Sequence, residues 1–308
     1  MQDFYYLSSN QKTQIHACVW KPQGEVKGVV QIVHGMAEYI ARYDEFATYL
    51  ANNGFVVCGE DHLGHGQSIG SPDELGFFAK GKSANLVLED IRALHLKMKD
   101  EFLGVPYFML GHSMGSFFAR VYASLYGDDL SGLVIMGTGV QPSVATGAGK
   151  FLCRLIGAFK GWKHQSKMID GIAFGSYNAQ IKDAKTKFDW LSVDEENVQK
   201  YIADDLCGYP FRCGGFYGLF EIIARACKGK TYANTPKNLP VFITSGADDP
   251  VGSYGKGVEK VYQKYVNAGL TDVSATLYRG ARHEILNDVC KSQAFSDLLE
   301  FFNNIYII

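Results

Sequence analysis

The chain has 308 residues, of which 47% are hydrophobic, and its formal net charge at pH 7 is -2. This length and composition predict one large globular domain, or one domain with an insertion, that buries a sizeable core. The balanced charge excludes a strongly basic surface for nucleic acid and a polybasic arm for membranes.

The cysteines and the N-terminus bear on the cellular compartment. The seven cysteines are an odd number and none has C-x-x-C spacing, which is typical of reduced thiols and disfavours a disulfide framework or a zinc site. The first ten residues lack a basic segment followed by an apolar one, so we expect no secretory signal. No apolar run reaches the length of a membrane span. We therefore expect a cytoplasmic protein.

The first half of the chain alternates short apolar strands with amphipathic helices. Two short strands that form a hairpin are predicted at residues 4–7 and 15–20. Buried strands are predicted at 28–33, 55–59, 107–110 and 133–136, and helices at 42–53 and 83–102. Because strands that alternate with helices form β-α-β units, we expect a mostly parallel sheet flanked by helices.

The alternation stops after the strand near Leu133 and resumes about a hundred residues later. The interval carries short, aromatic-rich helical segments at 151–162, 194–203 and 215–226. Beyond it, the pattern predicts strands at 241–245 and 273–278 and helices at 257–268 and 291–306. The sequence therefore predicts an α/β core, residues 1–138 and 238–308, interrupted by a helical cap at residues 139–237.

The segment between the strand at 107–110 and the next helix contains G-H-S-M-G at residues 111–115. In this setting G-x-S-x-G is the pattern of a nucleophile elbow, in which a strained turn lifts the serine hydroxyl above the sheet. The helix leaves so close to the strand that the positions flanking the serine must be small, and Gly111 and Gly115 meet that need. Ser113 is the predicted nucleophile, and an ordinary glycine-rich turn is the alternative.

A serine hydroxyl needs a general base within hydrogen-bond reach, and the base needs a carboxylate that orients it. In this fold the partners follow the serine in the order acid, then histidine. After the elbow the chain holds His164, in the predicted cap, and His283, just after the strand at 273–278. Because catalytic groups gather beyond the carboxyl ends of parallel strands, His283 is the predicted base.

Two adjacent carboxylates compete for the role of the acid. The strand at 241–245 runs into Gly246-Ala247-Asp248-Asp249-Pro250. The residue before proline is held in an extended conformation, which favours Asp249. Asp248 remains the alternative, and its other interpretation is a solvated or turn-capping carboxylate.

Attack on an ester carbonyl produces an oxyanion that preformed donors must stabilise. One donor is expected to be the backbone N–H of Met114, immediately after the nucleophile, and the second comes from the loop after an earlier strand. Met36, in the loop after the strand at 28–33, is the predicted second donor.

The remaining polar-loop histidines are interpreted as structural. His34, His62, His65 and His112 are expected to brace loops through hydrogen bonds. His62 and His65 by themselves could suggest a metal, but no third ligand is in view. No metal site and no cofactor are predicted.

Several segments, in this order and spacing, resemble the monoacylglycerol lipase and lysophospholipase group of α/β-hydrolases. They are H-G-M-A-E-Y-I-A-R-Y at 34–43, D-H-L-G-H-G-Q-S at 61–68, G-H-S-M-G at 111–115, G-A-D-D-P-V at 246–251 and the loop of His283. Two cap segments, 188–192 and 204–207, are similar to bacterial members. The resemblance implies an α/β-hydrolase fold and a cofactor-free serine esterase that works through an acyl-enzyme. The group usually has histidine where this chain has Tyr39. This difference is expected to affect the loop after the strand at 28–33 and the substrate preference, but not the triad.

Apolar residues recur at helical spacing in two predicted cap helices. Phe159 in the first helix, and Phe216 and Leu219 in the second, are the candidate substrate-binding residues of an acyl-chain tunnel or a membrane-touching lid. Packing of the cap against the core explains the same stripes and is the favoured alternative.

The leading hypothesis is hydrolysis of a carboxylic ester with a single acyl chain, such as a monoacylglycerol or a lysophospholipid. The expected partner is this small-molecule or lipid substrate, with a peripheral membrane contact through the cap left open. An aminopeptidase of the proline-iminopeptidase type is a second hypothesis, and it would need an acidic pocket, for which Glu38, Glu60 and Asp205 are candidates. A non-catalytic binding protein is a third, disfavoured because such proteins usually lose a member of the triad.

Overall fold

The computed structural model describes residues 1–81 and 83–306. Within these residues the strands are β1 (Gln2–Leu7), β2 (Gln14–Trp20), β3 (Gly28–Val33), β4 (Phe55–Glu60), β5 (Tyr107–His112), β6 (Gly132–Met136), β7 (Val241–Gly246) and β8 (Val273–Tyr278). The α-helices are α1 (Asp44–Asn52), α2 (Ala84–Glu101), α3 (Met114–Tyr126), α4 (Ser143–Lys160), α5 (Lys167–Phe174), α6 (Glu195–Ala203), α7 (Cys213–Ala226), α8 (Gly229–Asn234), α9 (Lys256–Asn267) and α10 (Lys291–Tyr306).

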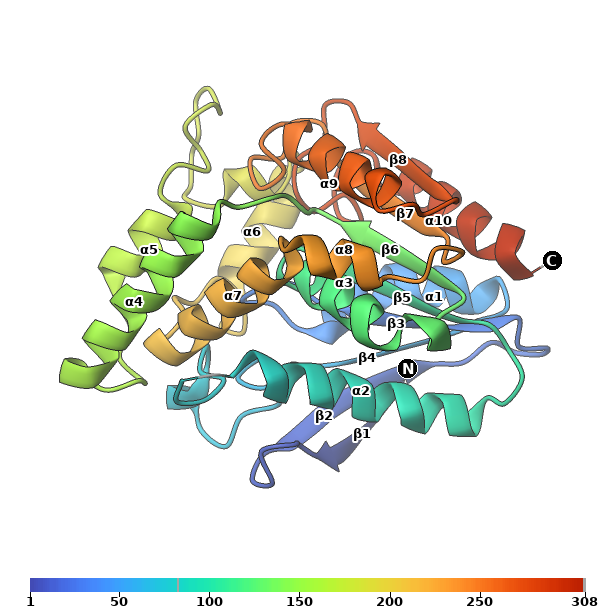
Figure 1. Ribbon diagram of the computed structural model, residues 1–308, viewed down its shortest axis with the longest axis horizontal. Helices are drawn as coiled ribbons and strands as arrows, with labels where there is room; N and C mark the ends of the chain where they lie inside the picture. Colours follow the sequence, from blue (N-terminus) through green and yellow to red (C-terminus); the bar gives the residue numbers. More distant parts are fainter. Residues whose placement is uncertain (82, 307–308) are drawn as a thin grey trace.

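The strands in this part of the chain form a sheet with the order β1-β2-β4-β3-β5-β6-β7-β8 (Figure 1). The pairs β1–β2 and β2–β4 are antiparallel, and every other neighbouring pair is parallel. This arrangement confirms the predicted α/β fold with a mostly parallel central sheet. The two edge strands, β1 and β8, are the least buried, and β3 to β7 are buried along their whole length, as expected for a sheet covered on both faces.

Alternate side chains of the inner strands build a separate core on each face of the sheet. In β3, Val30 and Ile32 pack with buried residues of α1 and α10, whereas Val29 and Val33 pack with those of α2 and α3. The same alternation runs through the neighbouring strands. The sheet therefore has a helical layer on each face, and this framework fixes the strand ends that carry the site.

The strand order reverses between β3 and β5. The chain passes from β3 to β4 on one side and then returns to β5 on the other side of β3. The loops that follow β3 and β5 therefore diverge beyond the carboxyl ends of these strands. In open α/β sheets this reversal point is where ligands bind.

A helical insertion follows β6, as predicted, and its helices α4 and α5 lie at one end of the molecule (Figure 1). There α4 packs against α7, and α7 packs against α3 of the core. The helix predicted at 151–162 is longer than expected, since α4 begins at Ser143. The helices α5 and α8 were not predicted, because segments this short show no clear helical period. α8 packs against α3 and α9, so it covers the core.

Candidate active site

The predicted elbow is present between β5 and α3, and Ser113 is its apex. Ser113 has φ 53° and ψ -118°, a conformation that ordinary residues avoid, and its N–H donates to the carbonyl of Met136 at 2.9 Å. A Cβ at position 115 would lie 1.9 Å from the carbonyl oxygen of Val33, and one at position 111 would lie 2.4 Å from that of Gly115. The two flanking glycines are therefore required by the close approach of α3 to the sheet.

The structure brings His283 and Asp249 together. The Nδ1 atom of His283 lies 2.9 Å from Asp249 Oδ2, which also accepts a hydrogen bond from Ser245 Oγ at 2.7 Å. Asp249 is fully buried, whereas Asp248 is exposed. Burial by itself raises the pKa of a carboxyl, but His283 and these hydrogen bonds bring the pKa of Asp249 below its usual value. Of the two competing carboxylates, Asp249 is the one that contacts the histidine.

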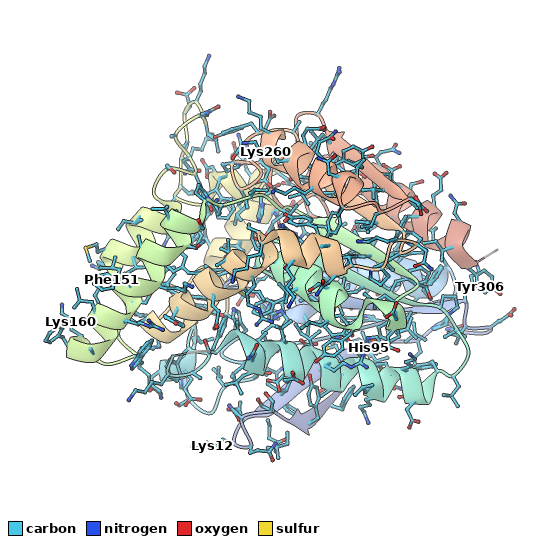
Figure 2. All side chains as sticks on the ribbon, in the orientation of Figure 1. Lys12, His95, Phe151, Lys160, Lys260 and Tyr306 are labelled. Atoms are coloured by element: carbon cyan, nitrogen blue, oxygen red, sulfur yellow. The ribbon has the colours of Figure 1, made fainter. Side chains whose placement is uncertain are left out.

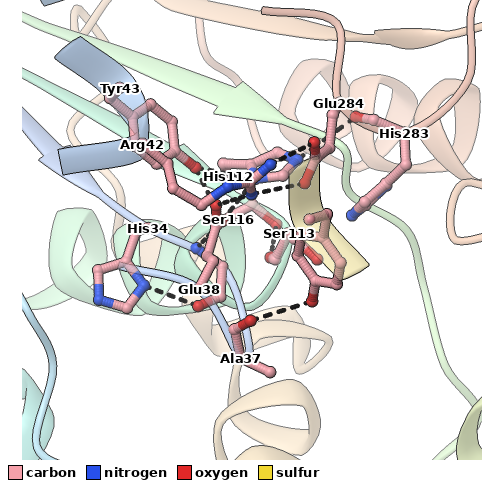
Figure 3. A network of polar contacts seen from close by, with 12 residues as sticks. His34, Ala37, Glu38, Arg42, Tyr43, His112, Ser113, Ser116, His283 and Glu284 are labelled. Carbon is pink, nitrogen blue, oxygen red and sulfur yellow. Dashed lines mark hydrogen bonds and ion pairs between the residues drawn. The ribbon is translucent and has the colours of Figure 1, made fainter. Parts of the chain in front are cut away.

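The opposite nitrogen of His283 is free. Its Nε2 atom is buried and has no hydrogen-bond partner among the described residues. His283 and Ser113 line the same cavity, and both are drawn in Figure 3. Trp190 packs against the histidine ring, with 5.0 Å between ring centroids. The available lone pair and the serine hydroxyl therefore face the same cavity.

Both predicted oxyanion donors, Met36 and Met114, line this cavity. Met114 is the first residue of α3, so its N–H has no partner within the helix. The loop of Met36 lies against the elbow, since a Cβ on Gly35 would be 3.2 Å from Ser113 Cβ. Ala37, at φ 53°, continues this strained loop, and its carbonyl accepts a hydrogen bond from Tyr201 of α6 at 3.0 Å.

The cavity has a volume of about 590 Å³ and runs from the elbow into the cap. Of the three predicted substrate-binding residues, Leu219 lines its wall. Phe216 is fully buried and packs against Phe211 and Phe220, one layer behind the wall. Phe159 is 83% exposed at the end of α4 and does not line the cavity.

The reason for the position of Phe159 is the rotation of α4. The face of α4 that meets α7 presents small residues and Leu152 to the cavity. Phe151, Leu155 and Phe159 recur every four residues on another face and are exposed, and Figure 2 shows Phe151 on the outer side of α4. The sequence suggested a single apolar stripe on this helix. In the structure, its residues lie on two faces, one that lines the cavity and one that is exposed.

Three buried histidines brace the loops beside the site, as predicted. The rings of His34 and His62 stack with 3.9 Å between centroids, and His62 N donates to His34 Nε2 at 3.0 Å. His62 Nδ1 lies 3.0 Å from Glu60 Oε1. Burial lowers the pKa of His65 to about 3, so this ring is neutral. Among the described residues no group of three or more histidine, cysteine, aspartate or glutamate side chains could hold a metal ion.

Sequence reasoning missed a buried ionic cluster next to the triad (Figure 3). Arg42 forms a two-pronged ion pair with Glu284 at 2.7 and 2.8 Å and a further contact with Glu38 at 2.7 Å. Two of its members are neighbours in the sequence, since Glu38 and Arg42 are four residues apart, and Glu284 directly follows the predicted base. Nothing in the sequence, however, indicated that residues so far apart would meet.

None of the helices in the described residues has the length and apolarity needed to cross a membrane.

Comparison with known proteins finds relatives that match most of the chain. A monoacylglycerol lipase of Mycolicibacterium smegmatis is 26% identical over 273 residues, which cover 88% of this chain and 86% of that protein. A monoglyceride lipase homolog of monkeypox virus is 25% identical over 272 residues, covering 88% of this chain and 87% of that protein.

A comparison with solved structures also finds an ester hydrolase with a similar fold. A carboxyl esterase from Bacillus coagulans, in complex with glycerol, superposes with a TM-score of 0.92 at 29% identity, covering 99% of this chain and 98% of that one. A family model described as serine aminopeptidase, S33, matches residues 24–289. Because this match spans most of the 308 residues, the chain belongs to that family of α/β-hydrolases.

Proposed function

We propose that this protein is a serine hydrolase that cleaves carboxylic esters with a single acyl chain through an acyl-enzyme. The observation that carries the proposal is that Ser113, at a strained elbow, and His283 line one mainly apolar cavity, with no described residue bonded to His283 Nε2. The esterase and lipases that resemble this chain along most of its length support ester hydrolysis.

In the proposed mechanism, Ser113 Oγ attacks the ester carbonyl carbon while His283 Nε2 takes its proton. Asp249 holds Nδ1 and stabilises the imidazolium that forms. The N–H groups of Met36 and Met114 stabilise the oxyanion. The alcohol then leaves with the proton from His283, and water repeats the steps on the acyl-enzyme with His283 as base.

The cap end of the cavity suits an acyl chain. Leu152 of α4, Leu219 and Ile223 of α7 and Phe117 of α3 form an apolar wall next to the elbow. Two polar side chains, Asp170 and Lys187, also line the cavity. An apolar arm for one chain and a more polar region for the alcohol fit an ester such as a monoacylglycerol or a lysophospholipid.

The family description keeps an aminopeptidase as the second candidate function. Its three candidate carboxylates are poorly placed to hold a free amine. Glu38 is paired with Arg42, Glu60 is buried beside His62, and Asp205 is exposed and does not line the cavity. We therefore expect nitrophenyl esters to be hydrolysed and proline anilide to be left intact, and the reverse preference would favour the aminopeptidase.

The outer face of the cap supports a peripheral lipid contact as part of this proposal. Exposed apolar side chains gather on α4 and α5, namely Val144, Phe151, Leu155, Phe159 and Met168, with exposed fractions from 45% to 83%. An apolar face of this kind partitions into the boundary between head groups and acyl chains. It would place the cavity of the cap next to the source of a lipid substrate.

The direct test of the proposed function is a series of nitrophenyl esters of increasing chain length, with Ser113→Ala as the control. The apolar arm predicts that kcat/KM rises with chain length to an optimum above the short esters. Loss of all activity in Ser113→Ala is expected. Equal hydrolysis by wild type and variant would contradict the assignment of Ser113, and an optimum at the shortest ester would contradict the acyl arm.

A further inference from the structure

The ionic cluster beside the triad contains a histidine, His112, and its neighbours determine its protonation state. Glu38 and Arg42 follow β3, His112 ends β5, and Glu284 follows β8 (Figure 3). All of these side chains are at least nine-tenths buried. They come from three separate segments of the chain, and they meet between the predicted oxyanion donor Met36 and the predicted base.

Both ring nitrogens of His112 face hydrogen-bond acceptors. Nδ1 lies 3.1 Å from Glu38 Oε1 and 2.9 Å from the hydroxyl oxygen of Tyr43. The Tyr43 hydroxyl is itself 2.9 Å from Glu38 Oε1 and donates its proton there, so its lone pairs face the ring. Nε2 lies 3.3 Å from the backbone carbonyl oxygen of His283, a group that only accepts. A neutral ring has one N–H and would leave one of these contacts unsatisfied, whereas an imidazolium satisfies both.

The charges in the cluster give an independent argument. Arg42 is paired with two carboxylates, those of Glu38 and Glu284, which leaves one negative charge in excess. An uncompensated buried charge is strongly unfavourable, and an imidazolium at His112 brings the sum to zero. Burial alone would lower the pKa of His112, but the hydrogen bond and the charge of Glu38 raise it above its usual value.

We propose that His112 is held as an imidazolium and acts as a positioning residue that ties the loop of the oxyanion donor to the loop of the catalytic base. The Glu38 oxygen that faces Nδ1 also accepts the Gly35 N–H at 2.6 Å, next to Met36. The Nε2 proton is donated to the backbone of His283, whose ring is 4.8 Å from that of His112. One cation therefore holds both halves of the machinery around Ser113.

This role rests on the proposed function, because it concerns how that site is held. His112 borders the cavity, but its side chain is only 4% exposed and both its ring nitrogens are engaged by protein atoms, so the role assigns it no polar contact with the substrate. Its loss should therefore reduce kcat and leave KM nearly unchanged. A residue that only fills space in the core would not produce this split. His95 offers a matched control, since it is a buried histidine of α2 that contacts Tyr122 at 2.8 Å and is remote from the cavity lining.

The first measurement needs no substitution. In the ¹⁵N-histidine-labelled wild type, long-range ¹H–¹⁵N spectra should show both ring nitrogens of His112 protonated at pH 7, where an ordinary imidazole is mostly neutral. His95, whose pKa burial lowers to about 4, should show one protonated and one bare nitrogen in the same spectra. A bare ring nitrogen on His112 at pH 7 would overturn the proposal.

The second measurement is kinetic, with His112→Gln and His95→Gln on a soluble short-chain ester. We expect kcat to fall about 10- to 100-fold in His112→Gln with KM within about twofold, as for a small misplacement of reacting groups, and no comparable loss in His95→Gln. Equal losses in both variants, or an effect on KM alone, would overturn the positioning role. Failure of the wild type to react with a fluorophosphonate would instead remove the proposed serine mechanism and leave the spectra of His112 interpretable.

Discussion

Ser113 holds its backbone in a region that favours glycine, at φ 53° and ψ -118°. Such strain is stored at functional sites and persists only because the surroundings enforce it. Here the hydrogen bond from Ser113 N to Met136 and the tight packing of Gly115 on β3 supply the enforcement. The elbow was predictable from five residues because its geometry accepts few other residue types.

A substitution at Ser113 should separate stability from function. Ser113→Gly relieves the strain, so we expect the free energy of unfolding to rise by about 1 kcal/mol relative to Ser113→Ala while activity is lost in both. Chemical denaturation of the two variants measures this difference. Equal stability of the two would show that the backbone at this position is not strained.

The choice between the two carboxylates gives a second prediction at this scale. Asp249 contacts His283, whereas Asp248 is exposed. Asp249→Asn is expected to lower kcat by about 10⁴, because the histidine loses the partner that fixes its tautomer, and Asp248→Asn should stay near wild type. Steady-state kinetics on a short ester compares them, and a comparable loss in Asp248→Asn would reopen the assignment.

At the scale of elements, the sequence predicted the strands and the long helices, but it predicted only part of the cap. β8 and α10 have the predicted bounds. In β8, β-branched and aromatic residues give the strand pattern, and in α10 a long helical period gives the helix. The short helices α5 and α8 carry no such signal. The sequence could not tell that Leu219 lines the cavity whereas Phe159 is exposed. The spacing of apolar residues gives the period of a helix, but it does not show which way the apolar face points.

The outer face of the cap yields a prediction of its own. Phe159→Ser removes an exposed apolar side chain from α4, so binding to phosphatidylcholine vesicles should weaken about tenfold, while hydrolysis of a soluble short ester is unchanged. Leu103→Ser, at a residue 77% exposed after α2, is the matched control and should bind as wild type. Co-sedimentation measures both, and equal binding of all three proteins would rule out the cap as the lipid contact.

The stability of the whole molecule should depend on acid through its buried histidines. The folded pKa of His65 is lowered to about 3, below the unfolded value of 6.5, so the unfolded state binds protons more readily. The cost of keeping this ring neutral grows as pH falls below about 6.5, and it reaches about 2 kcal/mol at pH 5.

Denaturation of wild type and His65→Phe at pH 7 and pH 5 tests this dependence, since the site is lined by Phe78 and Phe211 and a phenyl ring cannot titrate. We expect the variant to lose about 2 kcal/mol less than wild type on acidification. The same loss in both proteins would assign the acid sensitivity to other groups. His34, whose pKa burial also lowers, would then be the next candidate.

Across the whole chain, the features that could be predicted are those that depend on residues close together in the sequence. The parallel sheet, the elbow and the order of serine, acid and histidine follow from local motifs and strand ends. The buried pairing of Arg42 with Glu284 joins residues that are 242 positions apart, so it depends on the folded arrangement and left no local signal.

The central claim is that His283 makes the hydroxyl of Ser113 reactive. Labelling with a fluorophosphonate, followed by mass spectrometry of the modified peptide, tests it most directly. We expect rapid, single-site modification of Ser113 in the wild type, and labelling of His283→Ala slower by about 10³-fold or more. Modification at another residue, or equally fast labelling without His283, would contradict the account.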